Sequence, residues 1–450
     1  MRKNGMDRRR FLGAAGAAAA AVTVVPSRVL GLGGQNPPGG RLNVACIGLG
    51  WPGCKDTDAL AGDNNLVALC DVDSSRAPDF RKKYPDARPF QDYRRMWDAM
   101  EKGIDAVIVA TPDHTHAVLA MAAIRRGKHV YCEKPLAHSV HEVRELMKAA
   151  QAHKVVTQMG NQGHSSNETR MFCEWIRDGA IGKVHTIHAR SQSVNSGLNR
   201  LAEARRGAPV PAHLDWDLWL GPAQQRPFSP AYVHESWRGW VPFGDGTLGD
   251  WACHVLGPSF WALDLGAPSA VVAEVKDYDP QVRADVYPKS DIVTYEFPAK
   301  GDRGPVRLVW HSGAERLPRP KDLEPERKVV DTGAIVYGDG GAIMHGSHGA
   351  GGLRIFPEEK MKAYKRPAPT LPRVPRGGHE QDWARAIREG RKACSDFAQG
   401  GPLTEIALVG VIAIRLAGTR LEWDASTMRF TNCAEANPFV NPPYRDGWSL

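Results

Sequence analysis

Residues 42–53 read Leu-Asn-Val-Ala-Cys-Ile-Gly-Leu-Gly-Trp-Pro-Gly, an apolar run that breaks into Gly48-x-Gly50-x-x-Gly53. The run has the composition of a buried β-strand, and a helical pattern follows it. Gly48 permits a tight turn, Gly50 lets backbone amides approach a diphosphate, and Gly53 lets the helix pack closely on the strand. The positive end of that helix would point at the phosphates. The stretch predicts a dinucleotide-binding turn, and we expect Trp51 within it to contact the ligand.

An acidic residue follows the next apolar run at the spacing that ribose recognition requires. Residues 66–70 form that run, and Asp71 comes directly after it, eighteen residues past Gly53. A carboxylate there accepts hydrogen bonds from the adenosine ribose hydroxyls and repels a 2′-phosphate. The sequence therefore predicts NAD rather than NADP. A purely structural glycine turn is the alternative interpretation.

The first residues have the pattern of an export signal and are set aside from the fold. Residues 7–12, Asp-Arg-Arg-Arg-Phe-Leu, precede an alanine-rich apolar stretch at 13–25. Twin arginines before such a stretch match the Tat route, which exports folded proteins. The stretch is too short and too rich in alanine for a stable membrane span. We predict a signal peptide and linker at 1–36, and a location in the periplasm or cell envelope.

Charge and cysteine usage exclude two further classes of protein. The net charge is +8, of which residues 1–36 supply +5 through six basic residues and one acid. The remaining charge of about +3 is too small to predict nucleic-acid binding. The eight cysteines show no CxxC spacing and no cluster with histidine, so we expect neither a disulfide framework nor a metal site.

The hydrophobic pattern divides the rest of the chain into two domains. Residues 37–163 alternate short apolar runs with helical segments, which predicts a doubly wound parallel sheet, the Rossmann architecture. Residues 164–450 contain a helical pattern near 249–264, several alternating strand patterns, and a glycine-rich segment at 338–352 that we expect to be a loop. They predict an α/β domain with an open, mostly antiparallel sheet.

Polar or turn residues follow four of the predicted parallel strands. In such sheets ligands bind beyond the carboxyl ends of the strands. We therefore expect a cofactor site where these segments meet. The segments are Asp71, Thr111-Pro112, Glu133-Lys134-Pro135 and Gly160-Asn161-Gln162.

These residues resemble the Gfo/Idh/MocA family, which includes glucose–fructose oxidoreductase and inositol dehydrogenase, over nearly all of the chain beyond the leader. The resemblance rests on the glycine turn with Asp71, Thr111-Pro112 followed by His116, Glu133-Lys134-Pro135, and Gly249-Asp250-x-x-x-His254. It implies a Rossmann domain, an α/β domain whose open sheet often mediates oligomer contacts, and an alcohol or sugar substrate over the nicotinamide. A homodimer or homotetramer is therefore expected, with His116 at the cofactor site.

Hydride transfer from a carbinol needs a base for the hydroxyl proton. The Lys134 ammonium could hold the substrate oxygen and stabilise developing alkoxide charge. Asp250 and His254 are four residues apart on a predicted helix and share one face. His254 could accept the proton, while Asp250 binds a neighbouring hydroxyl or tunes the histidine. A solvated loop lysine and an ordinary exposed helix pair are the alternatives.

Six tryptophans fall between residues 216 and 261. Because indole faces stack on pyranose rings, this cluster favours a carbohydrate cleft, with core packing as the alternative that accounts for more than half of the tryptophans. We expect Trp237 and Arg238 to contact the substrate. Asn161 could bind the sugar or the nicotinamide ribose, or simply form a turn. His116 could be only a helix-start residue.

Together these features predict an exported NAD-dependent oxidoreductase. It would transfer hydride from a ring carbinol of a sugar or glycoside to tightly bound NAD, which is scarce outside the cytoplasm. One alternative is an NAD-dependent glycosidase that uses transient oxidation and elimination with no net redox change. Another is a non-catalytic, NAD-containing sugar-binding protein.

Overall fold

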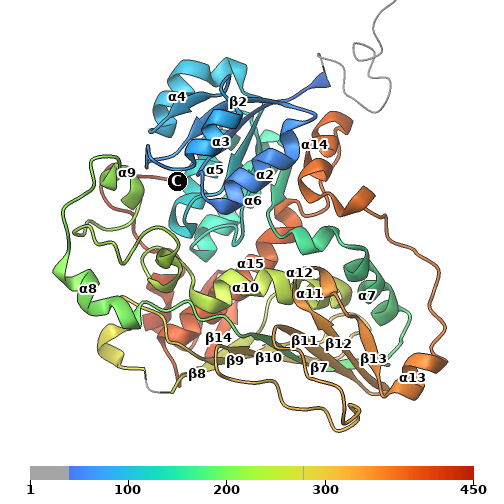
Figure 1. Ribbon diagram of the computed structural model, residues 1–450. Helices are drawn as coiled ribbons and strands as arrows, with labels where there is room; N and C mark the ends of the chain where they lie inside the picture. The colour runs from blue at the N-terminus through green and yellow to red at the C-terminus, as the bar shows by residue number, and fades with distance from the viewer. Residues whose placement is uncertain (1–39, 277) are drawn as a thin grey trace, which may run out of the picture.

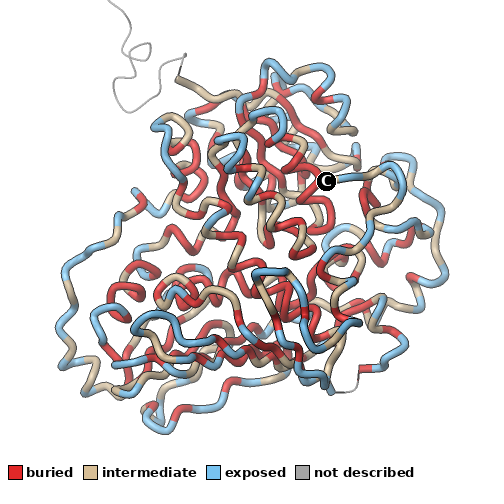
Figure 2. The backbone as a smooth tube through the Cα atoms, turned by 180° about the vertical axis from the view of Figure 1, so that it is seen from behind, coloured by how far each residue is buried: buried red, intermediate tan, exposed pale blue. Residues whose placement is uncertain are grey.

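A computed structural model describes residues 40–276 and 278–450 of the chain (Figure 1). The export signal predicted within 1–36 lies outside the described residues. The chain forms two sheets with helices between and around them. Buried residues concentrate along the strands of both sheets and the helices that join them (Figure 2).

The first domain contains a six-stranded parallel sheet in the order β3-β2-β1-β4-β5-β6. This is the doubly wound order that places a ligand crevice at its switch point, between β1 and β4. The central strands are buried on both faces, which explains their continuous apolar runs. The strands are β1 (Asn43–Ile47), β2 (Asn65–Cys70), β3 (Arg88–Phe90), β4 (Ala106–Val109), β5 (His129–Cys132) and β6 (Thr157–Met159).

Local signals set the boundaries of the helices between these strands. Ser139 and Glu142 form a capping box at the start of α6, and Asp92 caps α4 through the amide of Arg94. The elements are α2 (Trp51–Ala61), α3 (Pro78–Lys83), α4 (Tyr93–Met100), η2 (Glu101–Gly103), α5 (Asp113–Ile124) and α6 (Val140–His153).

The second domain is built on a nine-stranded sheet in the order β13-β12-β11-β7-β10-β9-β8-β14-β15. All neighbouring pairs are antiparallel except β7 and β10, which confirms the predicted fold class. The strands are β7 (Val184–Ser191), β8 (Ala270–Glu274), β9 (Ile292–Phe297), β10 (Val306–Ser312), β11 (Gly333–Gly338), β12 (Gly341–Gly346), β13 (Arg354–Phe356), β14 (Leu421–Asp424) and β15 (Arg429–Phe430).

Helices of the second domain cover the sheet face that points toward the first domain (Figure 1). The helices that cover it are α7 (Asn167–Arg177), α10 (Gly246–Val255), α11 (Gly257–Leu263), α12 (Ser347–Ala350) and α15 (Phe397–Arg415). The other helices of this part of the chain are α8 (Leu201–Arg206), α9 (Trp216–Leu220), α13 (Glu358–Ala363) and α14 (His379–Glu389), of which α14 packs against α2 and β5 of the first domain. Short 3₁₀ turns are η3 (Gln162–Ser165), η4 (Leu198–Arg200), η5 (Ser236–Gly239), η6 (Pro280–Val282), η7 (Pro375–Gly377) and η8 (Ala434–Phe439).

Two segments differ from the expectation from sequence. The helix predicted near 249–264 is interrupted, because Pro258 begins a second helix, α11, directly after α10. The prediction of a loop at 338–352 is wrong for 341–346, which form strand β12. The glycines at both ends of that strand suggest a loop, but the residues between them are buried and pair with β11.

Late segments of the chain tie the two domains together. Helix α15 packs against α6 of the first domain and against α10 and β8 of the second. Arg144 on α6 and Glu405 on α15 form a bidentate ion pair, with Nε–Oε2 and Nη2–Oε1 distances of 2.5 and 2.8 Å. Helix α14 returns to the first sheet, where Trp383 packs on Tyr131 with ring centroids 5.8 Å apart.

Helix α15 is also the one helix in the described part of the chain that is long and apolar enough to cross a membrane. Its apolar window is 83% buried inside the protein. Because a core helix between two domains is apolar on all sides, packing accounts for its composition.

The close approach of α15 to the second sheet can be tested at Gly410. A methyl group there would overlap the Tyr295 hydroxyl and press on Leu248. We expect Gly410→Ala to lower the free energy of unfolding by about 1–3 kcal/mol, since overpacking a tight contact forces neighbours to move. Gly304→Ala, where a methyl group meets open space, is the matched control and should change stability by less than about 0.5 kcal/mol. Equal effects in denaturant unfolding would contradict this packing.

Candidate active site

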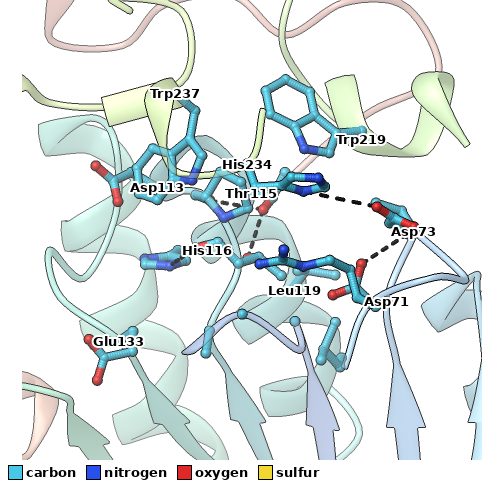
Figure 3. A pocket seen from close by; sticks show the side chains of 18 of the residues that line it. Asp71, Asp73, Asp113, Thr115, His116, Leu119, Glu133, Trp219, His234 and Trp237 are labelled. Carbon is cyan, nitrogen blue, oxygen red and sulfur yellow. Dashed lines mark hydrogen bonds and ion pairs between the residues drawn. The ribbon is translucent and has the colours of Figure 1, made fainter. Parts of the chain in front are cut away.

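A cleft of about 1180 Å³, including its open mouth, lies at the carboxyl ends of the parallel strands (Figure 3). One wall is formed by the strand ends and the turns that follow them. The other carries Trp219, His234 and Trp237 from the second domain (Figure 3). Residues expected from sequence that line the cleft are Gly48, Gly50, Trp51, Asp71, Thr111, Pro112, His116, Glu133, Lys134, Trp237 and Arg238.

The three glycines of the first turn have different structural roles. Gly48 has a φ of +95°, and a methyl group there would strike the carbonyl of Ala110. Gly53 packs directly on the carbonyl of Gly48, so it holds helix α2 against the strand and does not line the cleft. Gly50 is different, because a methyl group there would meet no atom closer than 3.8 Å. The protein therefore leaves space in front of Gly50, where α2 begins.

Asp71 lies at the end of β2 and faces this space (Figure 3). Its carboxylate accepts hydrogen bonds from the amides of Leu49, at 2.7 Å, and Asp73, at 2.9 Å. Burial raises the pKa of Asp71, and the two backbone donors and the nearby Arg76 oppose that effect. The carboxylate is thus oriented by the turn itself, in the position required for a ribose.

The glycine turn and Asp71 fit the two ends of an adenosine diphosphate. The N-terminus of α2 has no side-chain cap among residues 40–276 and 278–450, so its first amides face the open space at Gly50. Asp71, on the neighbouring strand, supplies the acceptor for ribose hydroxyls. With amides for the diphosphate and a carboxylate for the ribose, the described residues fit NAD.

Lys134 and Asp250 form an ion pair between the two domains. Lys134 follows β5, and its Nζ donates hydrogen bonds to the Asp250 carboxylate at 2.5 Å and the Asp250 carbonyl at 3.1 Å. The two side chains are only 13% and 14% exposed. Asn195 donates to the other carboxylate oxygen of Asp250 at 2.9 Å, and Arg238 approaches the first at 3.4 Å.

The charges of this pair are mutually stabilised. Burial favours the neutral form of Asp250, but Lys134 and Arg238 outweigh it and hold the pKa of that carboxyl below its usual range. Burial also opposes the charge of Lys134, but Asp250 and Glu133 raise the pKa of its ammonium. At neutral pH the site therefore presents a fixed cation beside a fixed carboxylate.

His254 lies one helical turn from Asp250 on α10, as its spacing predicts. Its ring stacks on that of His348, with centroids 3.9 Å apart and planes inclined by 20°. Nδ1 of His254 is buried and has no hydrogen-bond partner among the described residues. Burial and the charge of Lys134 lower the pKa of His254, so its imidazole is neutral at pH 7.

Two expected site residues have their side chains engaged elsewhere. Asn161 is buried, and its Oδ1 accepts a hydrogen bond from the Ser395 hydroxyl at 2.6 Å. The ring nitrogens of His116 lie 2.8 Å from the carbonyl oxygens of Thr111 and Pro135. His116 therefore joins the turns after β4 and β5, and positions the wall of the cleft.

The cleft also has residues that sequence reasoning missed. Trp448 of the C-terminal tail lines it, and the Arg94 guanidinium carbon lies 4.6 Å from the Trp448 ring centroid. The tail is held by Arg445, which pairs with Asp217 at 2.7 Å. Asn195, which hydrogen-bonds Asp250 from outside the cleft lining, is not part of a recognisable motif. A tail without periodicity and a single asparagine give no signal in a sequence.

Two carboxylates, those of Glu133 and the buried Asp56, lie close to each other near the cleft. Glu133, which follows β5, lines the cleft, and Asp56 on α2 lies near it with Oδ2 unpaired among the described residues. Burial and mutual repulsion raise the pKa of Asp56, and burial raises that of Glu133. In residues 40–276 and 278–450, no three His, Cys, Asp or Glu side chains are grouped to hold a metal ion.

Comparisons with known proteins agree with this architecture. The family model described as "Oxidoreductase family, NAD-binding Rossmann fold" (GFO_IDH_MocA) matches residues 42–161, and that of the family's C-terminal alpha/beta domain matches 194–299. Together they span about half of the chain.

Curated relatives match over part of the chain. Myo-inositol 2-dehydrogenase of Thermotoga maritima is 26% identical over 34% of this chain and 45% of its own length. Levoglucosan dehydrogenase of Pseudarthrobacter phenanthrenivorans is 26% identical over 54% of this chain and 55% of its own length. The chain thus spans about half the length of these relatives.

Solved structures share the fold over more of the chain. A levoglucosan dehydrogenase in complex with NADH and levoglucosan covers 85% of this chain and 99% of its own, with 19% identity and a TM-score of 0.55. The WlbA dehydrogenase of Bordetella pertussis, in complex with NADH and UDP-GlcNAcA, covers the same shares with 16% identity and a TM-score of 0.58.

The different surroundings of Gly50 and Gly53 give a test of the cofactor site. Gly50→Ala should leave the melting temperature nearly unchanged but weaken NAD binding about tenfold or more, because the methyl group fills space that a diphosphate needs. Gly53→Ala should lower both, since its methyl group overlaps the Gly48 carbonyl. Thermal melting and fluorescence titration with NAD distinguish them. Undiminished NAD affinity in Gly50→Ala would exclude this position for the diphosphate.

Proposed function

Because the chain belongs to the Gfo/Idh/MocA oxidoreductase family, we propose that it is an NAD-dependent dehydrogenase that oxidises a ring hydroxyl of a sugar or glycoside. The observation that carries the proposal is the ion pair of Lys134, which lines the cofactor cleft, with Asp250, which lies just outside the cleft lining. A fixed cation at that place can stabilise the negative charge that develops on oxygen when an alcohol is oxidised. A protein that only binds a neutral sugar does not need such a cation.

Bound NAD would supply the hydride acceptor. Lys134 then holds the hydroxyl oxygen that becomes a carbonyl, and its charge stabilises the negative charge that develops on that oxygen. The raised pKa of Lys134 keeps the ammonium protonated while it does so. Asp250 orients the ammonium and offers its carboxylate to a neighbouring hydroxyl.

His254 is the group that takes the hydroxyl proton in this proposal. A general base must be unprotonated at the working pH, and its lowered pKa meets that condition. Neither ring nitrogen of His254 is hydrogen-bonded to another described residue; Nδ1 is enclosed by protein, so Nε2 is the nitrogen assigned to the proton here. The ring of His348 stacks on the ring of His254 and limits its rotation.

A carbohydrate substrate is supported by the composition of the opposite wall. Trp237 lines the cleft with its ring covered by the Arg238 guanidinium, whose central carbon lies 4.3 Å from the ring centroid. Asn195 and Arg238 surround Asp250 with polar groups suited to hydroxyls. The relatives named for inositol and levoglucosan act on similar polyols, by their names.

The proposal extends to location and assembly. The twin arginines at 8–10 support export through the Tat route to the periplasm or cell envelope, with NAD held tightly enough to be carried along.

The family resemblance supports a homodimer or homotetramer. A segment that includes Leu317 and Leu323 covers the outer sheet face at β11 and β12. Contacts through the sheet would therefore use the face of β9 and β10.

Lys134→Met tests the proposed chemistry. We expect hydride transfer to fall about a thousandfold or more, because the developing oxyanion loses its charge partner, while NAD affinity changes little. Reduction of NAD is followed at 340 nm with inositols, levoglucosan and aryl glycosides. Lys148→Met, at an exposed lysine on α6, is the matched control. Turnover in Lys134→Met equal to that of the control would remove the lysine from the reaction.

The same mixtures separate the glycosidase alternative. Release of the aryl group without accumulation of reduced cofactor would replace net oxidation by the elimination route. Sugar binding without turnover in the unaltered protein would leave only a binding function.

The charge states predict the pH profile of sugar oxidation. Since His254 titrates below its usual range and Lys134 above it, kcat/KM should stay nearly level between about pH 6.5 and 9. Protonation of His254 should reduce the rate only at lower pH. At high pH the rate should fall when Lys134 loses its proton. Asp250→Asn removes a carboxylate that raises the pKa of Lys134, so this fall in kcat/KM should begin at a lower pH in that variant. An acid limb centred at pH 7 would rule out a neutral His254 in this role.

A further inference from the structure

A second cavity, of about 1060 Å³ including its mouth, lies behind the wall of the cofactor cleft. It is bounded by the segment that begins α6, the loop after α9, the loop before α10, the end of α15 and the C-terminal tail. The proposed dehydrogenase chemistry makes no use of it. Its charged lining residues are His138, Glu142, Arg226, Asp245 and Arg415.

The two arginines in this cavity have no hydrogen-bond acceptor and no ion-pair partner within the described residues. The Arg415 guanidinium carbon lies 3.7 Å from the ring centroid of Phe439, and that of Arg226 lies 5.2 Å from the ring centroid of Phe243. Both side chains are partly buried. Burial lowers the pKa of Arg415, because its charge is poorly solvated. An unpaired buried charge costs free energy that a bound anion would offset.

Each carboxylate in the cavity is held by another group through at least one oxygen. Oδ1 of Asp245 accepts from the ring of His138 at 2.9 Å, whereas its Oδ2 is buried without a partner among the described residues. Glu142 accepts from the amides of His138 and Ser139 and from the Tyr444 hydroxyl. Burial disfavours a charged His138, but Asp245 outweighs it and raises the pKa of His138 to about 9. The cavity thus holds three cations and two carboxylates, so its lining carries an excess of positive charge.

The remaining walls are mainly apolar. They are formed by Val241, Pro242, Leu408, Val411, Ile412, Pro442 and Pro443. A site with a few convergent polar groups in an apolar lining is typical of small-molecule pockets. The occupant would therefore combine an anionic head with an apolar body.

We propose that this cavity binds a small organic anion, a carboxylate or phosphate ester with an apolar body, through Arg226 and Arg415. Guanidinium groups suit both heads, because their forked donors match carboxylate and phosphate oxygens. The apolar portion lies against α15 and the proline-containing tail.

The same chain segments line both cavities, so the anion site is coupled to the cofactor cleft. Facing the cleft are Asp113, Trp219, Trp237, Arg238 and Trp448, and facing the second cavity, a few residues away in each segment, are His114, Ala223, Val241, Asp245 and Tyr444. The amide of Asp245 also donates to the carboxylate of Asp113 at 3.2 Å. An anion that orders these segments alters the NAD site, and by reciprocity NAD alters anion affinity. This coupling, unlike the anion site, rests on the proposed cofactor function.

Isothermal titration of the purified protein measures anion binding without turnover or added cofactor. The probes are benzoate, phenyl phosphate, inorganic phosphate and benzyl alcohol. We expect benzoate or phenyl phosphate to bind with a Kd below about 1 mM. Whichever binds more tightly identifies the head group. Inorganic phosphate and benzyl alcohol, each lacking one half of the chemistry, should bind about tenfold more weakly or worse.

Arg226→Gln and Arg415→Gln should each weaken binding about tenfold or more. Arg366→Gln, which removes a guanidinium stacked on Trp175 away from both cavities, should leave it unchanged. Ala223→Trp keeps both arginines and fills the cavity, so it should abolish binding even if an arginine variant fails to fold.

Two results would overturn the anion site. One is a lack of binding by both aromatic anions up to about 10 mM, and the other is equal affinity in the wild type and in Ala223→Trp. The coupling is tested separately by titrating NAD with and without saturating anion, where we expect a change in Kd of about fivefold or more. An unchanged NAD Kd with confirmed anion binding would refute the coupling alone. A failed dehydrogenase assay affects neither titration.

Discussion

The buried ion pair between Lys134 and Asp250 is the interaction on which the site depends. Each charge is removed from water, and such charges are tolerated only when they are paired and hydrogen-bonded. Lys134 belongs to the first domain and Asp250 to the second, so the pair exists only when the domains are docked. Asn195 and Arg238 complete the coordination of Asp250. The same contacts that make the carboxylate acceptable in the interior also fix the ammonium at the end of the cleft.

The docking of the domains is correspondingly extensive. Helix α15 packs on both domains, α14 returns to the first sheet, and the tail carries Trp448 back to the cofactor cleft. The two domains of the sequence are therefore not independent bodies in the structure. Residues far apart in the chain, such as Asp71 and Trp448, line one cleft because later segments cross back over the first domain. This interweaving also explains how a wall of the cleft can have a second cavity behind it.

The histidines show how burial assigns different roles to one residue type. His254 is held neutral by burial and Lys134, whereas His138 is held charged by Asp245. His116 lies within hydrogen-bonding distance of two carbonyls and connects two turns. None of these differences follows from the identity of the residue. Each follows from which charges and acceptors the fold places beside it.

The sequence by itself determined the parallel sheet, the glycine turn with Asp71, the family, and the shared helix face of Asp250 and His254. These features depend on local spacing, which periodicity and turn chemistry report directly. Strand β12 was not predicted, because glycines at both ends weaken the strand pattern of so short a segment.

Only the tertiary structure decided that Lys134 pairs with Asp250, that Asn161 bonds to Ser395, and that Arg226 and Arg415 share a cavity with no partner among the described residues. These outcomes depend on pairwise contacts between residues distant along the chain. Local sequence does not encode such contacts, because they arise only when packing removes the intervening water.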